Sequence, residues 1–322
     1  MIAREPLKSI LVLHDQPEQL RGILESEHQT IDIHYARNTR EVEQNLKVVK
    51  PDACFSISSE SITAAIMRAA GLYPSVRWFH VGGSGVDKML PWCSENATMT
   101  NGEGVLARHL AETVLGAILA MNNNYLQYQR QQSNKQWLGH HFKPLCDQTL
   151  LIVGLGAVGR KVADNAKALG MRVIATKRTV IDCPNVDALF ADSELSAVVD
   201  QADFITLHLS LSADTRHLID APMFNRMKNN ACLINTARGG IVDEKALIEA
   251  LRSTNIKAAF FDVFQEEPLS ADSPLWAVDN LIITPHVADG VFAFEKKYLQ
   301  FFSENVQRWN NNQALLNQLV FC

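Results

Sequence analysis

Three side chains with complementary chemistry follow apolar segments in the second half of the chain. Arg238 follows residues 233–237, Glu267 follows residues 260–264, and His286 follows residues 281–285. A guanidinium binds a carboxylate through paired hydrogen bonds, an imidazole transfers a proton near neutral pH, and a neighbouring carboxylate raises the pKa of that imidazole. Ligands of open α/β sheets bind outside the carboxyl ends of the strands, so we expect the three side chains to converge. Considered one at a time, each residue also has a non-catalytic interpretation: Arg238 as a surface cation, Glu267 as a loop carboxylate and His286 as a structural histidine.

A glycine-rich loop precedes these residues. Gly154, Gly156 and Gly159, with Ala157 and Val158 between them, follow the apolar segment 149–153 and open a helical segment. The first glycine permits a tight turn, the second lets a diphosphate approach the backbone, and the third lets helix and strand pack closely. We therefore expect the diphosphate of a dinucleotide at this helix N-terminus. A P-loop is the rival interpretation, but the G-K-[ST] that it requires is missing.

The next strand end predicts which dinucleotide is bound. A carboxylate there would accept hydrogen bonds from the ribose of NAD, but the chain has Thr176, Lys177 and Arg178. One hydroxyl and two cations suit a 2′-phosphate, so we expect NADP(H) to be favoured over NAD(H). The alternative is that Lys177 and Arg178 are a solvated pair on a loop.

Short apolar segments separated by helical patterns predict an α/β protein. We expect a linking helix from residue 106 towards residue 132, a helix over 244–251 and a helical tail over 291–318. The predicted strands are 8–13, 53–57 and 76–81 in the first half, and 149–153, 171–175, 204–209, 232–235, 258–263 and 281–284 in the second. The alternation of strand and helix begins once in each half of the chain, which predicts two doubly wound parallel sheets.

Length and composition agree with two globular domains. The chain has 322 residues, a net charge of −5, 47% hydrophobic and 20% charged residues. This composition excludes a disulfide-stapled module and gives no support for a nucleic-acid or membrane partner. Six scattered cysteines without a C-x-x-C pair predict reduced thiols in a cytoplasmic protein and no metal site, and His140 and His141 lack a third ligand at suitable spacing.

Five segments together resemble one enzyme family, the D-isomer-specific 2-hydroxyacid dehydrogenases, and most of all its glyoxylate/hydroxypyruvate reductase branch. They are 154–160 (GLGAVGR), 207–211 (LHLSL) with Thr215, 233–239 (LINTARG), 262–268 (DVFQEEP) and 284–288 (TPHVA). A weaker similarity reaches residues 83–87. Departures from the family pattern are Ser210, where proline is usual, and the bulky pair Phe260 and Phe261.

The resemblance implies NAD(P)H-dependent reduction of a small 2-keto acid to the D-2-hydroxy acid. Arg238 would bind the substrate carboxylate and polarise the carbonyl, and backbone N–H groups at Ser84 and Gly85 would hold the same carboxylate. His286 would deliver the proton, and Glu267 would keep that histidine protonated. Further cofactor contacts are implied for Leu209, Ser210, Thr215, Thr236, Ala237, Asp262, His286 and Ala288.

The resemblance also implies a domain plan and an assembly. We expect a flavodoxin-like substrate domain over residues 1–103, completed by 289–322, a Rossmann dinucleotide-binding domain over 104–288, and an interdomain cleft between them. A homodimer built on the helices around residues 106–132 is implied. Trp137 follows them and is assigned to core or interface packing.

Two other functions stay open. Transcriptional co-repressors that sense dinucleotides keep the same scaffold and similar residues, although no long disordered tail is evident here. A dehydrogenase for phosphorylated hydroxy acids would need more basic residues in the first domain than Arg77 and Lys88. His208 is interpreted as structural, and Ser84 is not a nucleophile because G-x-S-x-G would need glycine at Val86.

Overall fold

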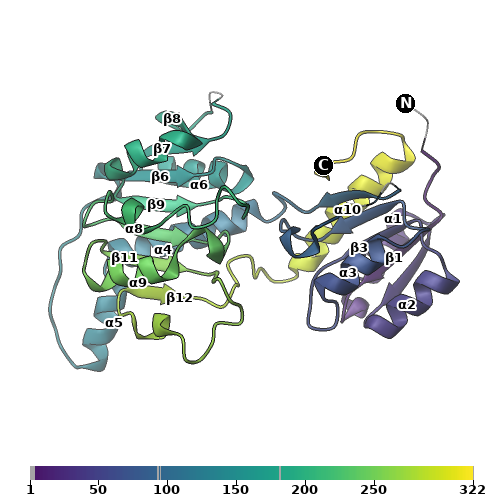
Figure 1. Ribbon diagram of the computed structural model, residues 1–322, viewed down its shortest axis with the longest axis horizontal. Helices are drawn as coiled ribbons and strands as arrows, with labels where there is room; N and C mark the ends of the chain where they lie inside the picture. Colours follow the sequence, from purple (N-terminus) through teal and green to yellow (C-terminus); the bar gives the residue numbers. More distant parts are fainter. Residues whose placement is uncertain (1–3, 93, 95, 181–182, 322) are drawn as a thin grey trace. The chain divides into compact units, whose positions relative to one another are not determined.

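The computed structural model describes residues 4–92, 94, 96–180 and 183–321. The chain forms two compact units (Figure 1). Unit 1 comprises Met1–Leu106 and Val291–Cys322, and unit 2 comprises Ala107–Gly290. The unit boundaries thus fall a few residues C-terminal to the expected ones.

Unit 1 is built on a sheet with the order β13-β5-β4-β3-β1-β2. Five of its strands are parallel: β1 (Ser9–Leu13), β2 (Asp32–Ala36), β3 (Ala53–Ser56), β4 (Trp78–Val81) and β5 (Thr98–Asn101). Their order, 2-1-3-4-5, is that of a flavodoxin-like doubly wound sheet. The predicted fold class is confirmed, with one addition: β13 (Gln318–Leu319) pairs antiparallel with β5 at the edge.

Helices cover both faces of this sheet because alternate strand residues point to opposite sides. On one face Ile10 and Val12 share a core with α1 (Ile23–Glu27) and α10 (Phe294–Asn310), which lie side by side (Figure 1). On the other face Leu11 and Leu13 share a core with α2 (Thr39–Val48) and α3 (Ala64–Gly71). The C-terminal helix therefore completes the core of the unit that the N-terminus begins.

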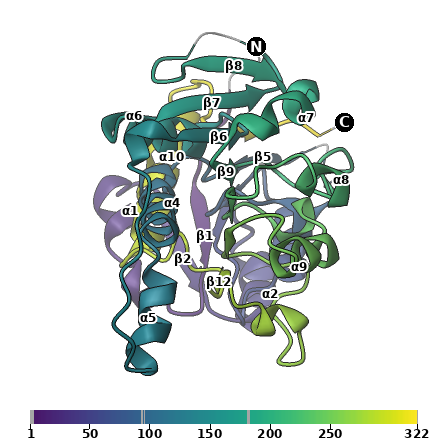
Figure 2. The same cartoon turned by 90° about the vertical axis from the view of Figure 1, so that its left-hand side faces the viewer.

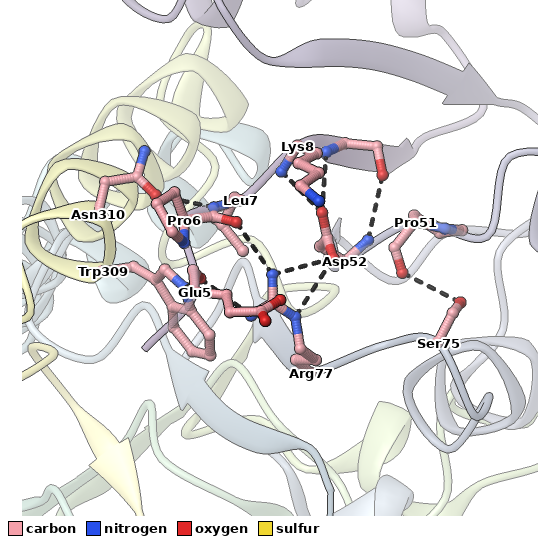
Figure 3. A network of polar contacts seen from close by, with 11 residues as sticks. Glu5, Pro6, Leu7, Lys8, Pro51, Asp52, Ser75, Arg77, Trp309 and Asn310 are labelled. Carbon is pink, nitrogen blue, oxygen red and sulfur yellow. Dashed lines mark hydrogen bonds and ion pairs between the residues drawn. The ribbon is translucent and has the colours of Figure 1, made fainter. Parts of the chain in front are cut away.

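A polar network ties the N-terminal segment to the strand starts and to α10 (Figure 3). Asp52 accepts hydrogen bonds from the backbone N–H groups of Lys8 and Ser9 and forms an ion pair of 2.9 Å with Arg77. Arg77 also donates to the carbonyl oxygen of Glu5, which accepts a second hydrogen bond from the indole of Trp309. The guanidinium of Arg77 thus serves this structural network rather than a phosphate.

Unit 2 is built on an all-parallel sheet with the order β12-β11-β10-β9-β6-β7-β8. Figure 2 shows β8, β7, β6 and β9 in succession. The strands are β6 (Thr149–Val153), β7 (Arg172–Lys177), β8 (Ala188–Ala191), β9 (Phe204–Leu207), β10 (Cys232–Asn235), β11 (Ala258–Phe261) and β12 (Leu281–Ile283). The order reverses between β6 and β9, which is the Rossmann switch point.

Two cores also flank this sheet. Leu150 and Ile152 face α4 (Ala107–Asn122) and α6 (Ala157–Ala168). Leu151 and Val153 face α7 (Leu195–Val198), α8 (Ala221–Phe224) and α9 (Glu244–Arg252). Short 3-10 turns occur at Pro17–Gln19, Asp87–Met89, Leu145–Asp147, Asp192–Glu194, Val199–Gln201, Gly239–Ile241 and Pro274–Ala277.

Two predicted helices differ from the observed ones. The expected helix over 106–132 is interrupted after α4, because Asn124 adopts a left-handed conformation (φ 57°) before α5 (Tyr125–Ser133) begins. The expected helical tail ends at Asn310, and the chain then continues to β13. Three strands, β2, β5 and β8, are not predicted from the sequence. All three are short and contain few large apolar residues, and they lie at or next to a sheet edge.

Candidate active site

The carboxyl ends of the strands of unit 2 place most of the predicted site residues at one edge of the sheet. The glycine loop follows β6, Arg178 follows β7, and Arg238 follows β10. Asp262 and Glu267 follow β11, and His286 follows β12. Parallel strands end at the same edge, so five chain segments that are far apart in sequence lie at this edge.

His286 and Glu267 form a hydrogen-bonded pair. Nδ1 of His286 lies 2.9 Å from Oε2 of Glu267, and the other carboxylate oxygen accepts the backbone N–H of Phe264 at 3.0 Å. The hydrogen bond to Glu267 is the largest cause that raises the pKa of His286, and the charge of Asp262 adds to it against burial and the charge of Arg238. The imidazole side chain remains 47% exposed. The contacts of His286 therefore favour the protonated form of an accessible imidazole.

Asp262 anchors the segment that carries His286. Its carboxylate, on a residue 1% exposed, accepts the hydroxyl of Thr284 at 2.6 Å and the backbone N–H groups of Val287 and Ala288, each at 2.9 Å. Its carbonyl oxygen accepts the N–H of His286 at 2.8 Å. These bonds hold His286 at a φ of 52°, which an L-residue adopts only when its surroundings impose it.

Arg238 is fixed by its backbone neighbours. The side chain of Asn235 donates to the carbonyl oxygen of Arg238 at 3.0 Å and accepts the N–H of Ala237 at 3.0 Å. The adjacent Gly239 packs directly on the Glu267 loop, because a Cβ atom there would lie 1.9 Å from the carbonyl carbon of Phe264. Only glycine permits this contact, which locks the Arg238 segment against the segment leading to Glu267.

The glycine loop after β6 leaves its backbone open to an approaching anion. Gly154 adopts a φ of +97°, and a Cβ atom on Gly159 would lie 2.5 Å from the carbonyl oxygen of Gly154. A Cβ atom on Gly156, in contrast, would meet open space. Gly156 precedes α6 without a side-chain cap, and the first N–H groups of a helix have no intrahelical partner. A negatively charged group can therefore approach these N–H groups closely.

A family model described as D-isomer specific 2-hydroxyacid dehydrogenase, NAD binding domain, matches residues 115–288. The chain belongs to this family. The 2-hydroxyacid dehydrogenase family consists of oxidoreductases, and the part of the chain that matches is almost the whole of unit 2.

Proteins with similar sequences are also dehydrogenases and reductases, which agrees with membership of this family. D-3-phosphoglycerate dehydrogenase of Methanocaldococcus jannaschii is 40% identical over 55% of this chain, but the match spans only 34% of its own length. Glyoxylate reductase of Korarchaeum cryptofilum is 29% identical over 84% of this chain and 83% of its own. Glyoxylate/hydroxypyruvate reductase B of Escherichia fergusonii is 30% identical over 90% of both chains.

Solved structures of the family share the fold over nearly the full length. A D-isomer specific 2-hydroxyacid dehydrogenase family protein from Aeromonas salmonicida has a TM-score of 0.87 at 29% identity, covering 98% of this chain and 99% of its own. A family member from Xanthobacter autotrophicus, in complex with NADPH and MES, has a TM-score of 0.81 at 25% identity, covering 97% of this chain and 98% of its own.

The residues of this dehydrogenase fit a nicotinamide dinucleotide. The glycine loop offers the open backbone that a diphosphate needs. At the ends of β9 and β10, the hydroxyl groups of Thr206 and Thr236 and Nε2 of His208 are buried and have no hydrogen-bond partner in the described part of the chain. Burial lowers the pKa of His208 to about 4, so that imidazole is neutral. Gly154, Gly156, Ala157, Val158 and Gly159 are the residues that would hold the diphosphate of such a dinucleotide.

The cationic strand end is only partly as expected. Thr176 is fully buried, hydroxyl group included, and its carbonyl oxygen accepts the N–H of Leu155 at 3.1 Å. Lys177 is half-buried and Arg178 is exposed. The two cations therefore remain candidates for a phosphate contact, and the hydroxyl of Thr176 does not.

The loop after β9 is shaped by Thr215. Its hydroxyl donates to the carbonyl oxygen of Ser210 at 2.7 Å and accepts the N–H of Ser212 at 2.8 Å. Leu209 is half-buried, whereas Ser210 is exposed. Ser210, which replaces the usual proline, is thus held through its carbonyl group, and the loop keeps a defined backbone.

Ser84 and Gly85 belong to unit 1, in the loop that follows β4. Both are exposed, and no described residue accepts a hydrogen bond from the N–H of either. Two successive free N–H groups form the kind of backbone that binds an anion. These donors lie on a different unit from Arg238 and His286.

Sequence reasoning missed the residues that hold the site together. Gly239 lies in the recognised motif but was given no role, and Asp262 was expected only as a cofactor contact. Asn101, which ends β5, donates from its side chain to the carbonyl oxygen of Ser84. The Asn-Gly pair at 101–102 is a typical turn sequence, and it is the sequence signal that could have drawn attention to Asn101.

The predictions on the cysteines, on membrane-spanning helices and on the bulky pair Phe260 and Phe261 can be compared with the structure. Cys54, Cys146 and Cys232 are not in disulfides, whereas Cys93 and Cys322 lie outside the described residues. Within the described part of the chain, no helix has both the length and the apolar surface to cross a membrane. Phe260 and Phe261 pack into opposite cores of the sheet, which explains how two bulky residues fit there. The cytoplasmic location stays a prediction.

Proposed function

We propose that this protein reduces a small 2-keto acid to the D-2-hydroxy acid with NAD(P)H. The observation that carries the proposal is the His286–Glu267 pair, with its 2.9 Å hydrogen bond, at the sheet edge that also bears Arg238. A carboxylate-binding cation and a protonated imidazole are the two groups that reduction of a keto acid requires from the protein.

His286 donates a proton from Nε2 to the carbonyl oxygen of the substrate. Its Nδ1 is committed to Glu267, so the tautomer and the ring orientation are set by that hydrogen bond. In the direction of oxidation the neutral imidazole accepts the same proton. A bound nicotinamide cofactor supplies the hydride in reduction and accepts it in oxidation.

Arg238 binds the carboxylate of the substrate and stabilises negative charge on the reacting oxygen. Its own backbone is held by Asn235, and Gly239 fixes it against the loop of Glu267. A guanidinium binds a carboxylate through two parallel hydrogen bonds. In unit 1 the free backbone N–H groups of Ser84 and Gly85 are donors of a kind that also binds an anionic group such as a carboxylate.

A small keto acid such as glyoxylate or hydroxypyruvate is the substrate class that we propose. The glyoxylate reductase and glyoxylate/hydroxypyruvate reductase relatives align over more than four-fifths of their length. The phosphoglycerate dehydrogenase relative aligns over about one-third of its length. In unit 1, Arg77 is occupied by Asp52, which removes one of the two cations considered for a phosphorylated substrate.

NADP(H) is the preferred dinucleotide in this proposal. Lys177 ends β7 and Arg178 follows it, at the position where NAD-specific folds place a carboxylate. The exposed guanidinium of Arg178 suits a 2′-phosphate, which it can bind through two parallel hydrogen bonds. The similar Xanthobacter protein was crystallised with NADPH, which supports the same choice.

A homodimer is the proposed assembly. The segment after α5 folds back on that helix, with Tyr128 accepting the N–H of His140 at 3.0 Å. It presents Trp137, Leu138 and Phe142 with 100%, 58% and 56% of their surface exposed. An apolar cluster of this kind marks a protein-binding surface, and a second copy of the chain is the occupant that we propose.

The function is tested by following absorbance at 340 nm with NADPH and NADH separately. The acids offered are glyoxylate, hydroxypyruvate, pyruvate and a bulkier aromatic 2-keto acid. Turnover of a small acid with NADPH supports both the reaction and the choice of cofactor. Tight dinucleotide binding without turnover of any acid would favour the dinucleotide-sensing alternative.

A further inference from the structure

The two free N–H groups of the Ser84 loop are oriented by a side chain that lies elsewhere in unit 1. Asn101, at the end of β5, donates from Nδ2 to the carbonyl oxygen of Ser84 at 2.8 Å. The residue is buried, with 3% of its surface exposed. Its Oδ1 accepts the N–H of Glu103 at 3.2 Å, so both ends of the amide are engaged and the donor cannot turn away.

The bond to Ser84 sets the direction of the next N–H group. The carbonyl of Ser84 and the N–H of Gly85 belong to one peptide unit, and this unit is trans. In a trans peptide the C=O and N–H bonds point in opposite directions. Because Asn101 holds the carbonyl inward, the N–H of Gly85 points outward.

The preceding peptide is held in the same way. The N–H of Gly102 donates to the carbonyl oxygen of Gly83 at 2.8 Å, and that carbonyl shares a peptide unit with the N–H of Ser84. Position 102 must be glycine, because a Cβ atom there would lie 2.5 Å from the ring of Tyr298. Neighbouring residues, Asn101 and Gly102, thus orient both N–H groups.

The C-terminal tail fixes these two residues in turn. Nδ2 of Asn317 donates to the carbonyl oxygens of Asn101 and Glu103, at 3.1 and 2.7 Å, on either side of Gly102. The tail is itself anchored on α10, where the buried side chain of Asn305 exchanges two hydrogen bonds with the backbone of Leu316. Three asparagines therefore connect α10 to the Ser84 loop.

We propose that Asn101 is a positioning residue for the substrate carboxylate and that Asn317 supports it from the C-terminal tail. This inference rests on the proposed function, because it assigns the Ser84 and Gly85 N–H groups to that carboxylate. Asn101 does not touch the substrate. It acts by keeping two peptide groups turned so that their N–H bonds remain available.

Two substitutions at position 101 separate its two contacts. Asn101→Ala removes both, whereas Asn101→Asp can still accept the N–H of Glu103 but places a carboxylate oxygen against the carbonyl of Ser84. We expect KM for glyoxylate to rise about tenfold in Asn101→Ala, as the loss of one net hydrogen bond predicts. The rise should be larger in Asn101→Asp, and kcat should change by less than about threefold in both.

The matched control is Asn122→Ala, which removes a buried asparagine of unit 2 that bonds to Gln148 and the backbone of Lys143. It should lower the melting temperature without moving KM. NADPH affinity should stay within about twofold of the wild type in every variant. Wild-type KM in both Asn101 variants would overturn the proposal.

A second readout does not depend on turnover. With 15N-glycine labelling, the amide resonance of Gly85 is one of 16 glycine signals and reports the orientation of its peptide. It should shift in Asn101→Ala and Asn101→Asp and stay in place in Asn122→Ala. If the wild type reduces no 2-keto acid, the proposed function fails, and an unmoved Gly85 resonance would separately overturn the positioning role.

Asn317→Ala tests the proposal if the variants at position 101 do not fold. Its side chain is only half-buried, so the fold should survive the substitution. We expect a rise in KM of about threefold and a smaller shift of the Gly85 resonance. A variant with neither effect would exclude the contribution of the tail.

Discussion

Nδ1 of His286 and Oε2 of Glu267 lie 2.9 Å apart, although 19 residues separate them in the chain. The contact is made by two loops that leave neighbouring strands, β11 and β12. Glu267 is the less exposed partner, with 24% of its side chain accessible against 47% for His286. The pair therefore presents the imidazole to the surface and keeps the carboxylate behind it.

The pH dependence of reduction should follow this pair. Because the pKa of His286 is raised, its protonated form persists to higher pH than that of a free histidine. Reduction should be fast below this pKa and decline as pH rises through it, and oxidation should show the opposite dependence. The stabilising effect of the protonated pair on the fold is likewise complete below the unfolded pKa of about 6.5 and lost as pH rises through the folded value.

Glu267→Gln should move that pH limb to lower values. The substitution removes the carboxylate charge, which, with the hydrogen bond it makes, is the main cause of the raised pKa of His286. The positive charge of Arg238 and burial then act against protonation. The measurement is kcat/KM for a keto acid between pH 5 and 9, and an unshifted limb would mean that Glu267 does not control the proton of His286.

Cofactor choice should depend on two cations. The double variant Lys177→Ala, Arg178→Ala should weaken NADPH binding about tenfold or more and change NADH binding by less than about twofold, as loss of a charged hydrogen bond predicts. Arg172→Ala is the control, because this exposed cation lies at the opposite end of β7. Fluorescence titration with both dinucleotides measures the effect. Equal losses for the two cofactors would assign the cations to folding.

Gly239→Ala should damage both stability and activity. Its Cβ atom would lie 1.9 and 2.4 Å from backbone atoms of Phe264 and Gln265, so the backbone must move. We expect a loss of about 3 kcal/mol in the free energy of unfolding, together with a larger fall in kcat/KM than the stability loss explains. Gly240→Ala is the neighbouring control, since its Cβ atom would meet side-chain atoms: methyl groups of Leu211 at 3.1 and 3.2 Å and the guanidinium of Arg216 at 3.6 Å. Denaturant unfolding and the 340 nm assay measure both variants, and equal behaviour would refute the role of Gly239.

The apolar segment after α5 should control assembly. Trp137→Ser combined with Leu138→Ser removes the most exposed apolar surface of that segment and should convert the dimer to monomers at micromolar concentration. Val320→Ser is the control, because Val320 is 87% exposed but lies in unit 1. Light scattering after size-exclusion chromatography gives the mass. A wild-type monomer would contradict the proposed homodimer, and a variant that remains dimeric would place the interface elsewhere.

The sequence predicts the cores of the sheets well and their edges poorly. Residues 149–153 and 232–235 are mainly apolar segments, each with one polar residue at an end, and they form β6 and β10 with those bounds. β2, with the sequence DIHYA, lies at a sheet edge and carries polar residues, so it lacks the apolar signal of a buried strand. β13 has two residues and depends on β5 for its pairing. Such strands are set by their partners rather than by their own residues.

The same distinction applies to the site. Arg238, Glu267 and His286 could be selected from their chemistry and their position after apolar segments. The burial of Thr176 could not, because the fully buried part of β7 extends one residue beyond the expected strand and ends at Thr176. The contacts of Gly239 and Asn101 join loops that are distant in sequence, and only the folded chain brings them together.

The most direct test of the account is the turnover of His286→Ala, measured at 340 nm with NADPH and the best keto acid of the wild type. General acid catalysis contributes about 10²- to 10⁴-fold, so kcat should fall by at least about 100-fold. NADPH affinity should remain within about twofold, because His286 is one of many implied contacts and the glycine loop would hold the diphosphate. A variant with normal turnover would contradict the assignment of His286 as the proton donor.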